Sequence, residues 1–240
     1  LWGGLPHFAD ASPALLQRGR LQAGEWVRLT DPKGRKHNLR LEAGAAFSTK
    51  KGQISHDDMI GHPEGIVIKS SMDADYQVFR PLLFEYVVSM PRGAAIIYPK
   101  DAAQIIAMAD IYPGARVVEA GAGSGSLTSY LLRAIGADGR LGSYEIRQEF
   151  ADDVRRNVEQ ITGPDVPGWT LTVGDVREVI TETEIDRLIL DMVDPWTCIP
   201  LAAERLVPGG IVCAYVATTT QLSMFVESIR AEGGFTEPHA

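Results

Sequence analysis

The sequence has few cysteines and no apolar run of membrane-spanning length. Cys198 and Cys213 are its two cysteines, and they lie in apolar segments without metal-site spacing, which favours buried reduced thiols over disulfides. No stretch approaches the roughly 20 apolar residues of a transmembrane helix. The first residues, LWGGLPHFADASP, lack a basic segment followed by an apolar core. We therefore expect no signal peptide and a cytoplasmic protein.

An excess of positive charge is absent from the whole chain but present in one part of it. The net charge is −8, yet residues 18–51 hold nine Lys and Arg against three Asp and Glu. A local positive field attracts phosphate even on an acidic molecule. This basic segment is either a nucleic-acid-binding surface or an ordinary solvated surface of strands and turns.

The first third of the chain has the pattern of short strands. EWVRLTDPKGRKHNLRLE alternates apolar and polar residues around DPKG, which predicts a β-hairpin. GIVIKSS and YQVFRPLLF continue the short-strand pattern. We predict an N-terminal extension over residues 1–20, a small β-barrel or β-sandwich domain over 21–80, and a connection over 81–98.

The pattern changes at Pro99, which predicts the start of a helix. Apolar runs then alternate with helical stretches, so the fold class is α/β, with a Rossmann-like, doubly wound parallel sheet over residues 99–240. Ligands bind such sheets beyond the carboxyl ends of the strands. Strands are predicted near 115–120, 140–145, 169–174, 186–191 and 210–217. Helices are predicted near 126–136, 147–160, 197–206 and 220–232.

A glycine-rich turn, VVEAGAGSG, follows the first of these strands. Gly121, Gly123 and Gly125 give the spacing G-x-G-x-G. A dinucleotide fingerprint beginning at Gly123 would need a third glycine where Thr128 stands, which weakens the nicotinamide interpretation. The turn resembles motif I of class I S-adenosylmethionine-dependent methyltransferases. In that case we expect Glu119 to order the loop and to favour the ammonium group of the cofactor.

The next strands also end in acidic residues. Glu145 ends the second strand, where a carboxylate can accept hydrogen bonds from ribose hydroxyls. Asp175 ends the third, where these methyltransferases place a residue beside the adenine. The fourth ends in LDMVDPW with two carboxylates. DPW resembles part of the motif of exocyclic-amine methyltransferases but lacks its second proline. We interpret Asp191 as the acting carboxylate and Asp194 as a helix cap.

Four segments together resemble the bacterial tRNA (adenine N1) methyltransferases, especially their actinobacterial branch. They are RPLLFEYVVSMPRGAAIIYPKDAAQI, VVEAGAGSGSLT, LDMVDPW and YVATTTQL. The resemblance runs from about Trp26 to Pro238. It implies methylation of adenosine 58 in the tRNA T-loop, S-adenosyl-L-methionine as cofactor, a small N-terminal β domain, a homotetramer, and neither metal nor membrane. The family continues past TEP with two further strands, so we expect that the natural protein is longer than this chain.

The resemblance also implies roles for individual residues. Asp191 would hold the adenine N6 amino group and balance the charge of the methylated ring, and Tyr98 would lie near the target base. The other interpretation of Tyr98 is a core aromatic residue at the start of a helix. Asp191 and Tyr98 are the predicted catalytic residues. The predicted cofactor-binding residues are Ile97, Glu119, Gly121, Gly123, Ser124, Gly125, Ser126, Leu127, Glu145, Phe150, Asp175, Val176 and Asp191. The predicted tRNA contacts are Arg35, Lys36, Lys50, Lys51 and Arg92.

Two other functions stay open at this stage. A protein isoaspartate carboxyl methyltransferase shares much of the glycine turn, but it has no basic β domain in front and does not need LDMVDPW. A non-catalytic RNA-binding subunit would be expected to lose either the glycine turn or Asp191, and both are present. The sequence does not distinguish modification of adenosine 58 alone from modification of adenosine 57 as well.

Overall fold

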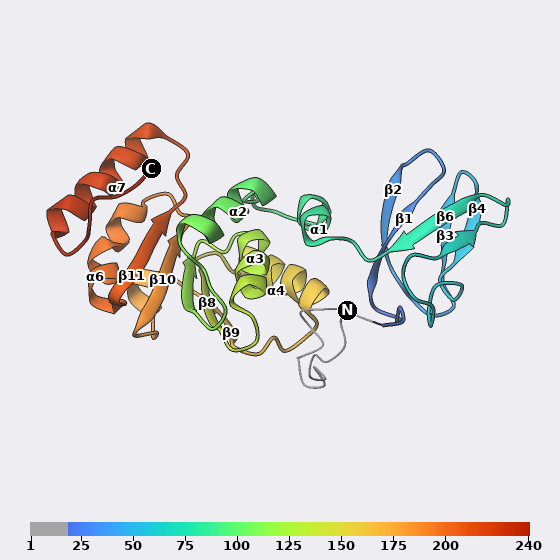
Figure 1. The fold of residues 1–240 in the computed structure, drawn as a ribbon, viewed down its shortest axis with the longest axis horizontal. Coiled ribbons are helices and arrows are strands. Elements are labelled where there is room, and N and C mark those ends of the chain that lie inside the picture. The colour runs from blue at the N-terminus through green and yellow to red at the C-terminus, as the bar shows by residue number, and fades with distance from the viewer. Residues whose placement is uncertain (1–18) are drawn as a thin grey trace, which may run out of the picture. The chain divides into compact units, whose positions relative to one another are not determined.

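A computed structural model describes residues 19–240, which form two compact units (Figure 1). The first, called here the β unit, ends at Ser89, and the second, the α/β unit, runs from Met90 to Ala240. Most of the predicted N-terminal extension, and Arg18 of the basic segment, lie outside the described residues. Each unit is described by itself.

The β unit holds two antiparallel sheets around one core. The larger has the order β2-β1-β6-β5 and the smaller is the hairpin β3-β4. Val27, Leu29, Ile54 and Val78 are fully buried in the shared core. The hairpin predicted around DPKG is present, because β1 and β2 pair antiparallel. The strands are β1 (Trp26–Thr30), β2 (Lys36–Arg40), β3 (Ala46–Thr49), β4 (Gly52–Ser55), β5 (Val67–Lys69) and β6 (Asp75–Phe79).

The β unit also contains a helix where the sequence pattern predicts a strand. Strand β6 ends at Phe79, and the last two residues of YQVFRPLLF, Leu83 and Phe84, begin helix α1 (Leu83–Ser89). Pro81 has no backbone N–H to donate to a sheet, so the strand does not continue through it. The buried carboxylate of Glu85 in α1 pairs with Arg28 of β1, and with Lys36 of β2 at 2.8 Å. The strand prediction for PLLF is therefore wrong, and α1 belongs to the β unit rather than to a connection.

The α/β unit is built on one parallel sheet with the strand order β11-β10-β7-β8-β9. This confirms the predicted fold class. The strands are β7 (Arg116–Ala120), β8 (Arg140–Glu145), β9 (Trp169–Val173), β10 (Ile185–Leu190) and β11 (Leu206–Ala214). The helices are α2 (Pro99–Met108), α3 (Ser126–Ile135), α4 (Gln148–Thr162), α5 (Val176–Val179), the 3₁₀ helix η1 (Pro195–Cys198), α6 (Ile199–Arg205) and α7 (Thr219–Glu232).

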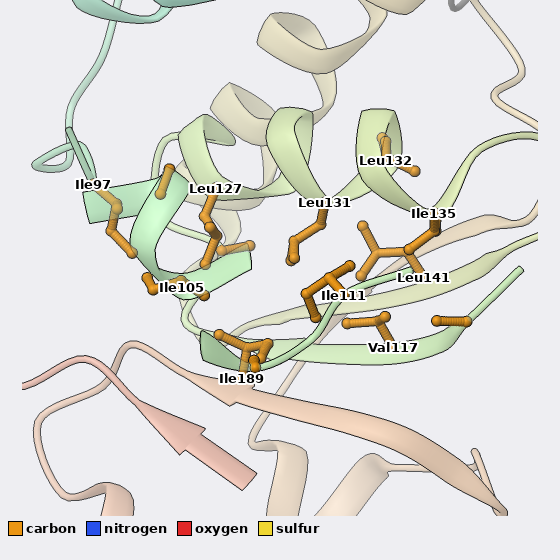
Figure 2. Close-up of a cluster of buried hydrophobic side chains, with 14 of the residues drawn as sticks. Ile97, Ile105, Ile111, Val117, Leu127, Leu131, Leu132, Ile135, Leu141 and Ile189 are labelled. Atoms are coloured by element: carbon orange, nitrogen blue, oxygen red, sulfur yellow. The ribbon is translucent and has the colours of Figure 1, made fainter. Parts of the chain in front are cut away.

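Helices cover both faces of this sheet. Val117 and Ile189 point to one face and pack against α2, α3 and α4 (Figure 2). Val118 and Leu188, the next residue and the one before, point to the other face and pack with α6 and α7. Strands buried on both faces lack the alternation of apolar and polar residues, which is why apolar residues are consecutive at Val117–Val118 in β7 and at Leu188–Leu190 in β10. The carboxyl ends of the strands are left to the loops.

Two further observations concern the described residues 19–240. None of their helices combines the length and the apolar character that a membrane crossing needs. Both cysteines are free thiols; Cys198 is buried and Cys213 half-buried. Burial raises the pKa of both, to about 11 for Cys198, so neither is a reactive thiolate at neutral pH.

We expect Leu131→Ala to destabilise the α/β unit by about 2–5 kcal/mol, because Leu131 is fully buried between α3 and the sheet and its truncation leaves a cavity. Urea unfolding measures the loss. Met108→Ala on α2 is the control, since Met108 is 54% exposed. Equal losses from both variants would contradict the assigned core.

Candidate active site

The glycine turn lies against the backbone of the segment that follows β10. Gly121 has a φ of +90°, and a β-carbon on it would stand 1.8 Å from the carbonyl oxygen of Asp191. The N–H of Asp191 donates to the carbonyl of Ala120 at 2.9 Å. Only glycine combines this φ with so close an approach. The turn predicted to hold a cofactor and the carboxylate predicted to act on a substrate are therefore adjacent.

Glu145 joins the ends of β7 and β8. Its carboxylate is buried and accepts the N–H of Gly123 at 3.0 Å and the N–H of Arg147 at 3.0 Å. Gly125, with a φ of +80°, caps the N-terminus of α3. These contacts hold the turn between the carboxyl end of β7 and the start of α3, where the first backbone N–H groups of the helix have no partner within the helix.

Glu119 is a buried acid with one unpartnered oxygen. Its Oε2 accepts hydrogen bonds from Thr128 Oγ1 at 2.7 Å and Ser143 Oγ at 2.8 Å, and Trp169 Nε1 donates in turn to Ser143 Oγ at 3.1 Å. Its Oε1 is buried without a partner in the described structure. Burial above all raises the pKa of Glu119 to about 7, against the two hydroxyl hydrogen bonds and aided by Asp191 and Glu145. A buried acceptor without a hydrogen bond lowers the stability of the folded chain, and a ligand with a hydrogen-bond donor would satisfy it.

Asp191 begins the segment after β10 and is half-buried. No residue within 19–240 donates a hydrogen bond to its carboxylate. Burial, and then the charge of Glu145, raises the pKa of Asp191 to about 6. Glu119, Glu145 and Asp191 thus meet at the carboxyl ends of three neighbouring strands. Perturbed acids in such a place indicate a functional site, and the negative potential of the three favours a cationic ligand.

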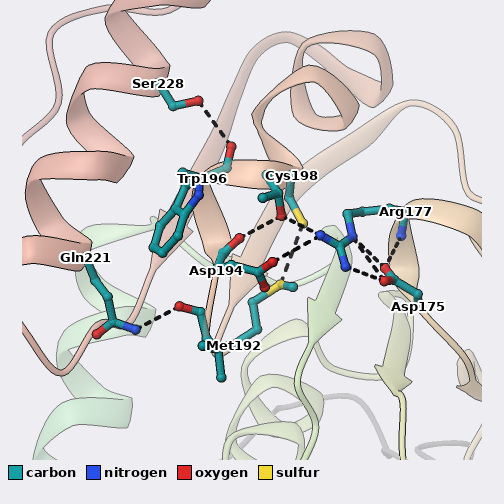
Figure 3. Close-up of polar contacts among 10 residues, drawn as sticks. Asp175, Arg177, Met192, Asp194, Trp196, Cys198, Gln221 and Ser228 are labelled. Carbon is teal, nitrogen blue, oxygen red and sulfur yellow. Dashed lines mark hydrogen bonds and ion pairs between the residues drawn. The ribbon is translucent and has the colours of Figure 1, made fainter.

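Asp175 and Asp194 share one arginine, Arg177 of α5 (Figure 3). The Arg177 Nε donates to both oxygens of Asp175, at 2.8 and 3.1 Å, and its Nη1 pairs with Asp194 at 3.2 Å. Arg177 lowers the pKa of Asp175. Asp194 occupies the predicted N-cap position, at η1, but its side chain makes no capping hydrogen bond and pairs with Arg177 instead. Asp175 caps another helix: its side chain accepts the backbone N–H of Arg177 at the start of α5.

Two tyrosines in the α/β unit expose aromatic surface. Tyr98 precedes Pro99 in extended conformation and is 53% exposed, which excludes the core interpretation of this residue. Tyr215 follows β11; its N–H donates to Leu190 at 2.9 Å and its hydroxyl lies 3.4 Å from a carboxylate oxygen of Asp101 in α2. Neither Tyr215 nor Arg177 is among the site residues predicted from the sequence. Tyr215 lies near the carboxyl end of the strand predicted at 210–217, and that position was the signal available for it.

Several predicted cofactor contacts have side chains turned away from this edge. The side chains of Ile97 and Leu127 belong to the core on the α3 face, and Val176 to the core on the other face. The hydroxyl of Ser126 donates to the Ile97 carbonyl at 2.7 Å, and that of Ser124 to the Ala95 carbonyl at 3.4 Å. These residues can contact a ligand through their backbone. Phe150 is half-buried at the start of α4, under the guanidinium of Arg147.

The predicted tRNA contacts differ in their free charge. Arg35 pairs with Asp31 at 2.6 Å and Lys36 with Glu85 at 2.8 Å, so both are neutralised within the β unit. Lys50 and Lys51 are exposed at the β3–β4 turn, and no ion pair of either occurs in residues 19–240. Arg92 is exposed in the α/β unit. Across the same residues, no group of three His, Cys, Asp or Glu side chains is arranged to hold a metal ion.

Comparison with known families agrees with this arrangement. Residues 80–239 match the family described as the tRNA methyltransferase complex GCD14 subunit, and residues 19–68 match a TrmI-like N-terminal family. The chain belongs to the GCD14 family. Among its relatives is the tRNA (adenine(58)-N(1))-methyltransferase TrmI of Thermus thermophilus, 34% identical over 85% of this chain and 79% of the relative. Another is the tRNA (adenine(57)-N(1)/adenine(58)-N(1))-methyltransferase of Methanocaldococcus jannaschii, 32% identical over 85% and 80%.

Solved structures resemble this GCD14 member over most of its length. The tRNA (m1A58) methyltransferase TrmI from Aquifex aeolicus aligns with a TM-score of 0.73 and 26% identity, covering 89% of this chain and 83% of that one. A SAM-dependent O-methyltransferase from Thermotoga maritima aligns with a TM-score of 0.79 and 29% identity, covering 88% and 78%. Both include the β unit as well as the α/β unit.

The raised pKa of Glu119 predicts a specific dependence of stability on pH. A buried acid with a folded pKa of about 7 and an unfolded value near 4.5 costs nothing below pH 4.5 and increasingly more as the pH rises to 7. Glu119→Gln removes this cost. We expect the stability of the variant, relative to the unsubstituted chain, to rise by about 3 kcal/mol between pH 4.5 and pH 7.5. Urea unfolding at both values measures the change; a pH-independent difference would show that Glu119 is ionised throughout.

Proposed function

We propose that this chain transfers a methyl group from S-adenosyl-L-methionine to N1 of adenosine 58 in tRNA. The observation that carries the proposal is Asp191: a half-buried carboxylate without a hydrogen-bond partner, held by backbone contacts against the glycine turn. Membership of the GCD14 family supports tRNA as the substrate.

The residues at the sheet edge fit this cofactor. Its amino-acid end carries an ammonium group, and the free, buried Oε1 of Glu119 is an acceptor of the required charge. Glu145, at the end of β8, has lone pairs beyond those that Gly123 and Arg147 use, and these can accept from ribose hydroxyls. The backbone at Gly121 and Gly123 leaves room for close approach. When bound, the cofactor supplies a methyl group on a positively charged sulfur.

The contacts of Asp175 favour a role different from the predicted one beside the adenine of the cofactor. Its two oxygens accept from the backbone N–H and the guanidinium of Arg177. A carboxylate has about four lone-pair sites, so little capacity is left for an adenine amino group. We propose that Asp175 stabilises the turn at the start of α5 and that the backbone of Val176 contacts the adenine of the cofactor.

The role of Asp191 follows from the charge that the reaction creates. Adenine N1 is neutral at pH 7 and a weak nucleophile, so the protein contributes mainly by alignment. The methylated ring becomes cationic, and a nearby carboxylate stabilises that charge as it develops. With a pKa of about 6, Asp191 is mostly ionised at neutral pH, and an approaching positive charge lowers this pKa further. Its oxygens can accept from the N6 amino group and so orient the ring.

Access to the base requires that the nucleotide leave its stack. Tyr215 exposes aromatic surface after β11, and Tyr98 exposes it at the start of α2, the helix whose Asp101 lies 3.4 Å from the Tyr215 hydroxyl. An extruded adenine can stack on such surface. The hydroxyl of Tyr215 also lies beside Asp101, which limits the movement of its ring. We propose that these two tyrosines form the wall of the acceptor site.

The rival functions are less well supported. An isoaspartate carboxyl methyltransferase would not account for the match of residues 19–68 to the TrmI-like N-terminal family. The O-methyltransferase of Thermotoga maritima has a similar fold, but an O-methyltransferase creates no cationic ring for Asp191 to balance. A non-catalytic subunit would not need a glycine turn packed against the backbone of a residue whose carboxylate has no hydrogen-bond partner. Relatives in Cryptococcus neoformans are named catalytic subunits, and the chain covers about half of their length.

The finer parts of the proposal are the assembly and the location. We propose a homotetramer acting in the cytoplasm. The support for self-association is the apolar surface at the start of α1, where Leu82 is 58% and Phe84 48% exposed. Soluble proteins seldom leave such groups of apolar side chains uncovered.

We expect Asp191→Ala to lower kcat/KM for methyl transfer to unmodified tRNA by about 10²–10³-fold, because one charge-stabilising group is removed. Cofactor affinity, measured by calorimetry, should change little. Asp138→Ala is the control, since Asp138 is exposed in the turn before β8, at the opposite end of the strands. Labelled methyl transfer is the assay. Equal activity of the two variants would remove Asp191 from the reaction, and transfer to protein instead of tRNA would refute the function.

The basic hairpin turn predicts a salt effect. Lys50→Gln with Lys51→Gln should weaken tRNA binding and reduce the slope of log K against log salt by about 2, one for each phosphate that the variant no longer neutralises. Lys69→Gln is the control, because Lys69 is paired with Asp73 at 2.6 Å. If the double variant had the same slope as the unsubstituted chain, Lys50 and Lys51 would not contact tRNA phosphates.

A further inference from the structure

Arg177 makes contacts to two separate segments at the carboxyl edge of the sheet. On one side its Nε donates to both oxygens of Asp175, and its Nη2 pairs with the same carboxylate. On the other side its Nη1 donates to Thr197 Oγ1 at 2.8 Å and pairs with Asp194 at 3.2 Å (Figure 3). The first partner follows β9, and the other two follow β10.

No sheet contact joins these two segments. In the order β11-β10-β7-β8-β9, two strands separate β9 from β10, so the ladder of backbone hydrogen bonds does not connect the residues that follow them. Asp175 borders the region where we propose that the cofactor binds. Asp194 and Thr197 belong to the segment that carries Asp191. The guanidinium of Arg177 therefore links the cofactor side of the site to its acceptor side.

The segment from Asp191 to Thr197 is held at several points. Thr197 donates back to the Asp194 carbonyl at 2.7 Å, which closes the turn. From α7, Gln221 donates to the Val193 carbonyl at 2.8 Å and Ser228 to the Trp196 carbonyl at 3.1 Å. Arg177 holds the side of the turn opposite α7. Without it, Asp194 would lose its cation and the segment would be anchored from one side.

The donors of Arg177 are nearly all in use. A guanidinium has five N–H groups; the Nε–H is directed at Asp175, both Nη1 hydrogens at Thr197 and Asp194, and one Nη2 hydrogen at Asp175. One N–H remains, which is too few for the two-pronged recognition of a phosphate. The geometry thus favours a role within the site over a direct contact with the tRNA backbone.

We propose that Arg177 is a positioning residue for methyl transfer: it holds the Asp194–Thr197 turn against the cofactor-side turn at Asp175 and so sets where Asp191 presents its carboxylate. This rests on the proposed function and adds a residue to it. Asp191 is three residues from Asp194, so a turn that moves displaces the carboxylate with it. Displacement of about 1 Å in an aligned site costs up to about 100-fold in rate.

The same contacts contribute little to global stability. The side chains of Arg177 and Asp194 are each 36% exposed, and ion pairs at that exposure are weakened by solvent and salt. Loss of Arg177 should therefore affect the rate much more than the melting temperature. This separates a positioning residue from one that merely supports the fold.

The test compares Arg177→Met, Arg177→Lys, Asp194→Asn and the double variant Arg177→Met/Asp194→Asn. Arg155→Met is the control, since Arg155 is an exposed arginine on α4 paired with Glu159 in its own helix. For each protein, kcat and KM for tRNA come from labelled methyl transfer, the Kd for S-adenosylmethionine from calorimetry, and Tm from thermal unfolding.

We expect Arg177→Met to lower kcat by about tenfold or more, with the KM for tRNA, the cofactor Kd and the Tm near those of the unsubstituted chain. Arg177→Lys should recover part of the rate, because an ammonium can pair with one of the two carboxylates but cannot fork between them. The double variant should be no slower than Arg177→Met, since both changes break the same link. Arg155→Met should match the unsubstituted chain.

Other outcomes would overturn the assignment of Arg177. An unchanged kcat in Arg177→Met removes it, a loss confined to the KM for tRNA makes it a tRNA contact, and losses that multiply in the double variant show two independent roles. A fall in Tm that accounts for the reduced rate makes it merely structural. Absence of tRNA methylation by the unsubstituted chain is a different result, because it rejects the proposed function itself.

Discussion

The approach of Gly121 to the carbonyl oxygen of Asp191 is the constraint on which the rest of the site depends. A β-carbon at position 121 would lie 1.8 Å from that oxygen, so any side chain there would force the two loops apart. β7 and β10 are neighbours in the sheet, and the hydrogen bond from Asp191 to Ala120 continues their pairing past the last strand residue. This contact sets the backbone of the cofactor turn and the backbone of Asp191, and the contacts of the turn that follows Asp191 decide the direction of its carboxylate.

This contact concentrates negative charge. Glu119, Glu145 and Asp191 end three adjacent strands, and their mutual repulsion adds to burial in raising the pKa of Glu119 and Asp191. The arginines nearby offset only part of it: Arg177 is engaged by Asp175 and Asp194, and Arg147, whose side chain is 56% exposed, pairs with Glu145 at 3.7 Å. A positively charged ligand lowers the repulsion among the three carboxylates. The charges that reduce the stability of the protein therefore increase its affinity for a cation.

The sequence predicted the α/β unit well because its elements have a clear hydrophobic period. Each predicted strand and long helix corresponds to an observed one, and the glycine turn, Glu145 and Asp191 lie at the strand ends as expected. The failures have a different cause. PLLF is a short run of consecutive apolar residues, and such a run has no periodicity that would distinguish a strand from the observed helix α1. The partner of Asp194 is Arg177, which belongs to another segment. A cap can be predicted from neighbours in sequence, whereas a long-range ion pair cannot.

The same limit applies to the basic segment. Counting charges in residues 18–51 treats each lysine and arginine as available to phosphate, but pairing in the folded chain decides which of them is. Asp31 takes Arg35 locally, within the turn of the first hairpin, while Glu85, 49 residues from Lys36, takes that lysine and the nearby Arg28. The helix that carries Glu85 is the one the strand pattern concealed. Assigning α1 correctly therefore changes the electrostatic interpretation of strands far from it, and it moves the expected phosphate contacts from β2 to the β3–β4 turn.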